Sequence, residues 1–310
     1  MPVSPQTLYA AQRSSRLTHT LAHMLAITLT AALASVLSGC SWPAATTTAA
    51  ALPSTGSQTV TSLTTPATEL QARLDAWLPA DVLLLGEQHD APAHQALEGQ
   101  IVAALASRGQ LAALTLEMAD SDSSTASLSP KSTEAQVRSA LVWDNDAWPW
   151  AAYGPAVMAA VRAGVPVLGA NLARAHFRAS MADAQLDQRL PGPALKAQQL
   201  LIRQGHCDLL PESQITPMTR IQIARDQRMA ETLQGALQPG RVVVLLAGSV
   251  HADRQLGVPQ HLPPGLRVKA IRLQAGASSS PGESFDSVWA TEAAPETDHC
   301  EGLRRRLGKN

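Results

Sequence analysis

The stretch Val82–Asp90 (VLLLGEQHD) runs from four apolar residues through one glycine into four polar residues. A short, continuous apolar run is typical of a strand that is buried on both faces of a sheet. Behind it, the segment Pro92–Ser107 places Leu97, Ile101 and Leu105 at helical spacing, and proline is tolerated in the first turn of a helix. The stretch therefore predicts a buried strand followed by an amphipathic helix.

The same alternation of apolar runs and amphipathic segments continues along the chain. Further strands are predicted at Leu111–Leu116, Val165–Leu168 and Val242–Leu246, with an outer strand at Arg267–Leu273. Further helices are predicted at Gly154–Ala163, Pro193–Gln204 and Met218–Gln238. Strands that are separated by helices indicate an α/β fold, in which a parallel sheet is covered by helices on both faces.

Polar side chains follow each of the four buried strands. They are Glu87 and His89 after the first, Glu117 after the second, Asn171 after the third and His251 after the fourth. A single glutamate at such a position is usually a helix cap, and a single histidine is usually packed in the interior. However, the carboxyl ends of parallel strands meet at one edge, where ligands bind in open α/β sheets. The pattern therefore predicts one common cavity lined by these residues.

Two other segments carry candidate binding residues. The helix from Met218 places Arg225 and Asp226 on one side, either as a solvated face or as an anchor for carboxylates. The stretch Ala140–Pro155 holds Trp143, Trp148, Trp150 and Tyr153. These rings either pack in the core or form one wall of a site for a large, flat ligand.

The N-terminus reads as a targeting segment. Basic residues precede the apolar run Met24–Leu37, which leads into Leu37-Ser38-Gly39-Cys40 and is too short to span a bilayer comfortably. The last four residues resemble a bacterial lipobox, although an ordinary secretory signal or a buried helix would also give an apolar run. We expect a signal peptide over residues 1–39, a palmitate-bearing lipid on Cys40, a linker over 40–67 and a folded domain over 68–310.

Export would place the domain in the cell envelope. In some bacteria, an Asp directly after the lipid-carrying cysteine retains the lipoprotein at the inner membrane. The residue after Cys40 is Ser41, so we expect an anchor in the outer membrane, facing the periplasm. An oxidising compartment favours a disulfide between Cys207 and Cys300, the alternative being two free thiols. The 24 Lys and Arg residues nearly balance the 25 Asp and Glu residues, which argues against nucleic-acid binding.

The chain resembles the ChaN-like haem-binding lipoproteins, which share a superfamily with erythromycin esterases and Tiki proteins. The similarity covers about residues 81–273. It is carried by the segments Leu83–Asp90 with His94, Leu114–Met118, Tyr153–Pro155, Val165–Leu172, Arg225–Ala230, Ala247–His251 and Gly257–Leu262. It implies a three-layer α/β/α sandwich with a mainly parallel sheet, an added helical subdomain, and a homodimer that holds paired haems.

The resemblance also implies that Tyr153 ligates haem iron, since a phenolate is a suitable ligand for ferric iron. A neighbouring histidine would support the phenolate, and His89, His94 and His251 are the candidates. Haem is thus the expected cofactor and partner, and haem or iron uptake or storage is the expected function.

The alternative is a hydrolase, either an esterase or a metal-dependent peptidase-like enzyme. Glu87, His89, Glu117 and His251 would then supply a general base or hold a divalent metal with its water. His89 and His94 are five residues apart rather than four, and the chain has no Gly-x-Ser-x-Gly motif, so no standard hydrolase motif is present. A third possibility is that these residues only organise loops, with Glu87 and Arg225 as a buried ion pair.

Overall fold

The computed structural model describes residues 66–277, 284–295 and 297–307. Within them, six strands form one sheet in the order β3-β2-β4-β1-β5-β6, and all neighbouring strands are parallel. The strands are β1 (Val82–Glu87), β2 (Leu111–Asp120), β3 (Val167–Asn171), β4 (Val242–Gly248), β5 (Val268–Ala275) and β6 (Ser287–Thr291). The predicted α/β fold with a parallel sheet is therefore confirmed.

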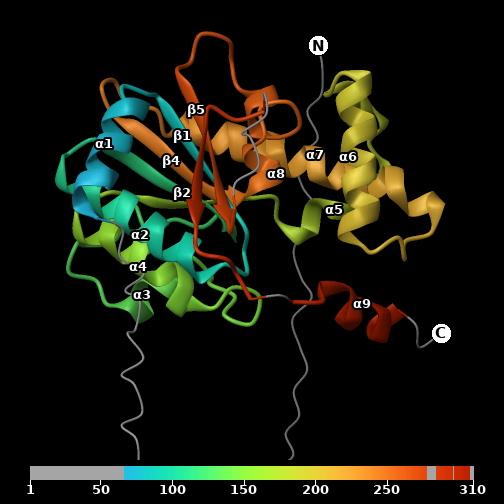
Figure 1. Cartoon of the computed structure of the whole chain (residues 1–310), viewed down its shortest axis with the longest axis horizontal. Helices are drawn as coiled ribbons and strands as arrows, with labels where there is room; N and C mark the ends of the chain where they lie inside the picture. The colour runs from blue at the N-terminus through green and yellow to red at the C-terminus, as the bar shows by residue number, and fades with distance from the viewer. Residues whose placement is uncertain (1–65, 278–283, 296, 308–310) are drawn as a thin grey trace, which may run out of the picture. The chain divides into compact units, whose positions relative to one another are not determined.

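Helices connect these strands (Figure 1). The α-helices are α1 (Ala67–Trp77), α2 (Pro92–Ser107), α3 (Glu134–Ala140), α4 (Trp150–Arg162), α5 (Phe177–Ala182), α6 (Gly192–Gly205), α7 (Glu212–Gly235), α8 (Ser249–Ala252) and α9 (His299–Leu307). Three short 3-10 helices are η1 (Arg174–His176), η2 (Ala184–Gln188) and η3 (Val258–His261).

The sheet buries both of its faces, because successive side chains of a strand point to opposite sides. In β1, Leu83 and Leu85 pack in one hydrophobic core with residues of α1, α2 and α4. Val82 and Leu84 pack in a second core with residues of α7 and α8. The result is the three-layer sandwich that the continuous apolar runs predicted.

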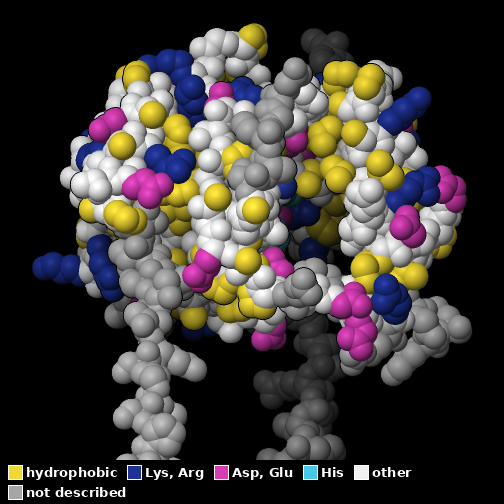
Figure 2. All heavy atoms as spheres, viewed as in Figure 1, with side chains coloured by type: hydrophobic (Ala, Val, Ile, Leu, Met, Phe, Trp, Pro, Cys, Tyr) yellow, Lys and Arg dark blue, Asp and Glu magenta, His cyan; other side chains and the backbone are white. Residues whose placement is uncertain are grey.

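Helices α5 and α6 pack on α7 and form the added helical subdomain (Figure 1). This part has a small core of its own around Leu186, Leu190 and Ile223. In Figure 2, the drawn face is hollowed between the sheet and these helices, and Lys or Arg side chains lie at the bottom of the hollow.

Two strand predictions need correction. The segment expected to be an outer strand is β5, which lies between β1 and β6, so the edge on this side is β6. Periodicity did not reveal β6 because only one of its five residues is buried, so it has no continuous apolar run. Strand β2 continues beyond Leu116 to Asp120, since a register shift after Leu116 lets Asp120 pair with Asn171 of β3.

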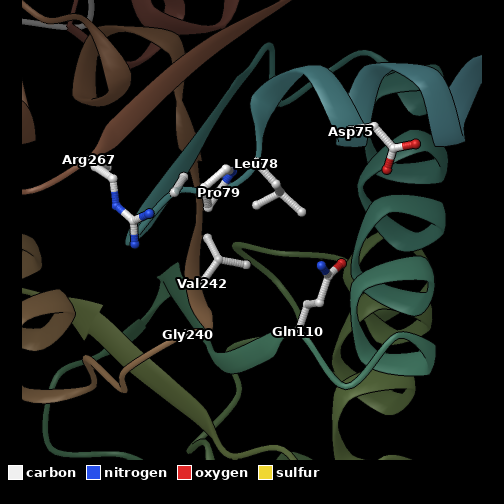
Figure 3. A pocket seen from close by; sticks show the side chains of 8 residues that line it. Asp75, Leu78, Pro79, Gln110, Gly240, Val242 and Arg267 are labelled. Atoms are coloured by element: carbon white, nitrogen blue, oxygen red, sulfur yellow. The ribbon is translucent and has the colours of Figure 1, made fainter.

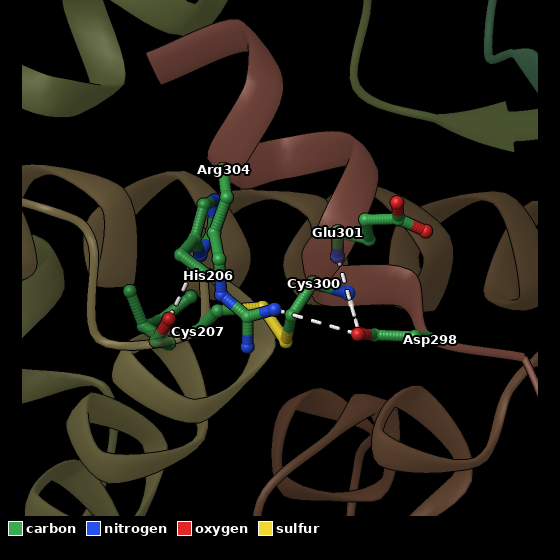
Figure 4. Close-up of a disulfide and its surroundings, with 7 residues drawn as sticks. His206, Cys207, Asp298, Cys300, Glu301 and Arg304 are labelled. Carbon is green, nitrogen blue, oxygen red and sulfur yellow. Dashed lines mark hydrogen bonds and ion pairs between the residues drawn. A yellow bond between two sulfur atoms is a disulfide. The ribbon is translucent and has the colours of Figure 1, made fainter. Parts of the chain in front are cut away.

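The C-terminal helix α9 is attached to the helical subdomain by a disulfide between Cys207 and Cys300 (Figure 4). Cys207 follows α6, and Cys300 lies at the start of α9. Nearby, Asp298 accepts hydrogen bonds from the backbone N–H groups of Cys300 and Glu301. The expected pairing of these two cysteines is thus present in the structure.

The expected signal peptide, the lipobox with Cys40 and most of the linker lie outside the described residues. Helix α1 begins at Ala67, one residue before the expected start of the folded domain. In the described part of the chain, no helix has the length and apolar character needed to cross a membrane.

Candidate functional site

The strand-end residues converge because β1, β4 and β2 are neighbours in the sheet. Glu87 ends β1, Gly248 ends β4 beside it, and Glu117 lies near the end of β2 on the other side of β4. The space above Gly248 holds the imidazole of His89, whose Nδ1 lies 2.8 Å from Glu87 and whose Nε2 lies 3.7 Å from Glu117. His89 therefore bridges two carboxylates that come from different strands.

Glu117 is the centre of the polar cluster. Its side chain accepts hydrogen bonds from Arg225 at 2.5 Å and from the backbone N–H of Gly248 at 2.8 Å. Asn171 links the same groups, because it accepts a hydrogen bond from Arg225 and donates one to the backbone carbonyl of Glu117. Burial raises the pKa of Glu117, but the charges of His251 and Arg225 outweigh it and hold the pKa well below its usual range.

His251 lies between two acids in the interior. Its Nδ1 is 2.5 Å from Asp226 of α7, and its Nε2 is 3.4 Å from Glu117. Burial alone would lower the pKa of His251, but Glu117 and Asp226 raise it to about 9. The buried imidazole is therefore a cation at neutral pH, held by two carboxylates.

Glu87 is almost completely buried and accepts three hydrogen bonds. The donors are the Tyr153 hydroxyl at 2.8 Å, the Nδ1 of His89 at 2.8 Å, and the side-chain amide of Gln95. The sequence had suggested Arg225 as a partner for Glu87. Arg225 pairs with Glu117 instead, because α7 brings it to the β2 side of the cluster.

An aromatic cavity of about 450 Å³ lies beside His89. Its walls come from the loop after β1, the start of α2, the loop before α4 and α4 itself. They include His89, Pro92, Gln95, Trp148, Pro149 and Tyr153. The His89 and Trp148 rings meet edge to face, with their centroids 4.9 Å apart. Of the two alternatives for the tryptophan-rich stretch, Trp148 lines a cavity, whereas Trp150 belongs to the hydrophobic core.

The predicted site residues form one connected polar cluster. Among them, the aromatic cavity touches His89 and Tyr153. The side chains of Glu117, Asp226 and His251 lie in the interior behind His89. The strand-end residues thus meet as predicted, with the buried acids covered by the groups that pair with them.

Replacing Gly248 with alanine should displace His89. An added Cβ would lie 2.9 Å from His89 Nε2, which is closer than real contacts allow. The ring would have to leave its place between Glu87 and Glu117, and because the His89 side chain is partly exposed, we expect a stability loss of only about 1 kcal/mol, the lower end for overpacked sites. Urea unfolding measures the loss, and the NMR signals of the His89 ring report the movement. Unchanged His89 signals in the folded variant would contradict this packing.

His94 does not reach the cavity. It is fully buried on α2, and its Nδ1 accepts a hydrogen bond from the backbone N–H of Gln88 at 2.9 Å. Burial lowers its pKa to about 4, so the ring is neutral. Its role is to hold the loop after β1, and the position of its Nε2 inside the protein does not fit a ligand to a bound group.

Two residues of this region, Gln95 and Glu98, were not among the site residues predicted from the sequence. Gln95 donates to Glu87, and Glu98 lies fully buried on α2, one helical turn after His94. Burial, together with the charge of Glu87, raises the pKa of Glu98 well above its usual range. The spacing of Gln95 and Glu98 relative to Ile101 and Leu105 could have indicated their burial, because it places both polar residues on or beside the apolar face of the helix.

The opposite edge of the sheet carries a separate cavity of about 360 Å³ (Figure 3). It lies where β4 and β5 begin, and Gln110, Val242 and Arg267 are among its lining residues. None of the predicted site residues takes part in it. Over the described residues, no three or more His, Cys, Asp or Glu side chains are grouped so that they could hold a metal ion.

Solved structures of other proteins are similar to this chain to different degrees. A solved structure of ChaN from Campylobacter jejuni, described as binding haem cofacially, is 27% identical, with a TM-score of 0.57, and the match covers 67% of this chain and 87% of that chain. An erythromycin esterase in its open conformation is 15% identical, with a TM-score of 0.43, over 72% of this chain and 78% of that chain. No curated protein matches the sequence.

The family model described as "Haem-binding uptake, Tiki superfamily, ChaN" matches residues 73–262, which is more than half of the chain. The matched residues contain β1 to β4 and the whole polar cluster. The chain therefore belongs to the ChaN haem-binding uptake family of the Tiki superfamily.

Proposed function

We propose that this protein binds haem in the aromatic cavity beside His89 and serves haem uptake or storage. The cavity carries the proposal. Its volume of about 450 Å³ lies within the range of roughly 300–1,000 Å³ that is typical of small-molecule sites. Its walls of tryptophan, proline and alanine suit the flat, apolar face of a porphyrin. The family of the chain and its ChaN relative support the same ligand.

His89 fits the role of an axial ligand. About 37% of its side chain is exposed, its Nδ1 donates to Glu87, and its Nε2 lies 3.7 Å from Glu117, beyond hydrogen-bond distance. Ligating histidines usually donate their other ring N–H to a carboxylate, which fixes the orientation of the ring. Burial lowers the pKa of His89, but the hydrogen bond to Glu87 and the charge of Glu117 outweigh burial and raise the pKa above its ordinary value.

Haemin titration of the mature protein tests the proposal. We expect a saturable shift of the Soret band, and we expect His89→Ala to weaken haemin affinity by at least about tenfold, the lower bound seen when the ligand environment of a metal is disrupted. His176→Ala is the matched control, because His176 is exposed on η1, away from the cavity. Unsaturable binding, or equal affinity in both variants, would refute a haem site at His89.

The geometry favours binding over hydrolysis. A general base must be able to accept a proton near the working pH. His251 is held as a cation by Glu117 and Asp226, and it is almost completely buried. Of the two strand-end histidines, His251 is therefore already protonated and does not serve as a general base.

We also propose that a lipid on Cys40 anchors the domain to the outer membrane and that the domain forms a homodimer. The order of basic residues, apolar run and Leu-Ser-Gly-Cys supports the anchor. Labelling with a palmitate analogue that is lost in Cys40→Ala would support lipidation, and labelling that survives in this variant would refute it. Sedimentation with and without haemin measures the oligomeric state.

A further inference from the structure

The hydroxyl of Tyr153 points away from bulk solvent. Only 2% of the residue is exposed, and the hydroxyl donates a hydrogen bond to Glu87 at 2.8 Å. The ring lies beside Trp143 and Trp148, with centroid separations of 6.1 and 6.0 Å. The side chain lines the aromatic cavity with its ring, while its oxygen is turned to the acid behind the wall. For the oxygen to reach a ligand, the ring would have to leave this aromatic packing and Glu87 would lose a donor.

The surroundings of Tyr153 also oppose a phenolate. Burial, followed by the charges of Glu87, Glu98 and Glu117, raises its pKa above the ordinary value. In the protein without haem, burial and the neighbouring acids therefore keep the proton on the phenol oxygen, and the hydroxyl is the donor of the hydrogen bond to Glu87.

The contacts of Glu87 explain what this donor does. Glu87 sits at the carboxyl end of β1 and has to remain an acceptor for the Nδ1 of His89. Tyr153 from α4 and Gln95 from α2 donate to the same carboxylate from the other sides. A carboxylate held by two further donors cannot turn, and the imidazole that donates to it is held in one tautomer and one orientation.

We propose that Tyr153 is a positioning residue that orients Glu87, and through it His89, and that it is not the iron ligand. The inference rests on the proposed haem site only for the identity of the ligand. It corrects the role that the family resemblance implied for Tyr153. The sequence contains one other tyrosine, Tyr9, which lies within the expected signal peptide. Cleavage of this signal peptide would leave Tyr153 as the one tyrosine of the mature domain, which would therefore bind iron without a phenolate.

The first test uses the protein without haem. In Tyr153→Phe, the ring packing is kept and the hydrogen bond to Glu87 is lost. At a pH high enough for the His89 ring to be neutral, we expect its ¹⁵N signals to change from a single tautomer towards a mixture of tautomers, and we expect Glu87→Gln to cause a comparable change. Trp143→Phe is the control for altered aromatic packing and should leave these signals in place. Unchanged His89 signals in Tyr153→Phe would overturn the positioning role of Tyr153, whatever Glu87→Gln does.

The second test adds haemin to the same variants. We expect the ferric spectrum of Tyr153→Phe to match that of the wild type, with a loss of haemin affinity no larger than that of His89→Ala, because Tyr153 acts on His89 only through Glu87. A phenolate charge-transfer band that is present in the wild type and lost in Tyr153→Phe would overturn the inference while leaving the haem function intact. If neither protein binds haemin, the proposed function fails, and the His89 signals still decide the positioning role.

Discussion

Replacing His251 with leucine is expected to remove about 3–5 kcal/mol from the free energy of unfolding, the range found when one partner of a buried ion pair is removed. The substitution places an apolar side chain in the interior and leaves Asp226 and Glu117 without their shared cation. Most of this loss comes from the unpaired charge of Asp226, because Asp226 is fully buried and its second oxygen already has no hydrogen-bond partner within the described residues. Urea unfolding of wild type and variant measures the loss.

The ion pairs of His251 with Asp226 and Glu117 also predict how the free energy of unfolding depends on pH. The pKa of His251 is about 9 in the folded protein and 6.5 for the unperturbed side chain. A group whose pKa is raised by folding stabilises the protein fully below its unfolded pKa and loses that effect as the pH rises through the folded pKa. We therefore expect the free energy of unfolding to fall between about pH 6.5 and pH 9 in the wild type.

Two comparisons isolate this effect. The His251→Leu variant should lack the fall between these pH values, whereas His176→Leu, at an exposed position, should retain it and cost little stability. A double variant that also replaces Asp226 with leucine should recover part of the loss, because a matched apolar pair avoids the unpaired charge. Equal pH profiles for wild type and His251→Leu would show that His251 is not the buried cation.

Breaking the disulfide is expected to have an effect of similar size. The cysteines are 93 residues apart, and a cross-link that closes a loop of roughly 100 residues stabilises by about 4–5 kcal/mol in the chain-entropy description. The closed loop contains α7, β4, β5 and β6, so the restraint acts on half of the strands that the structure describes. Cys207→Ser with Cys300→Ser should therefore unfold at a clearly lower urea concentration than the wild type.

A reductant provides the matched control. It should lower the stability of the wild type to that of the double serine variant and should leave the variant unchanged. Because the effect acts mainly on the unfolded chain, the polar cluster around Glu117 should keep its NMR signals in the folded variant. No difference between oxidised and reduced wild type would mean that the cross-link does not restrain the cooperative unit.

Much of the sheet could be predicted from the sequence because its strands are buried on both faces. Val82–Leu85 and Val242–Leu246 have to be apolar throughout, so their signal does not depend on any neighbour. Strand β6 has five residues, and three of them are only partly buried, so it carries no such pattern. It becomes a strand because β5 offers it a free edge, which is information that the local sequence lacks.

The candidate site, too, has features that the local sequence predicts and features that depend on neighbouring segments. The meeting of Glu87, His89, Glu117, Asn171 and His251 could be predicted from the residue order alone, since parallel strands bring their carboxyl ends to one edge. Which of these side chains face solvent, and which atoms they pair with, depends on how the distant segments pack. The neighbours of Tyr153, namely Glu87, Glu98 and two tryptophan rings, come from β1, α2 and the loop before α4. The state of a phenol depends on the charges and burial around it, and these are set by packing between distant segments rather than by the order of residues along the chain.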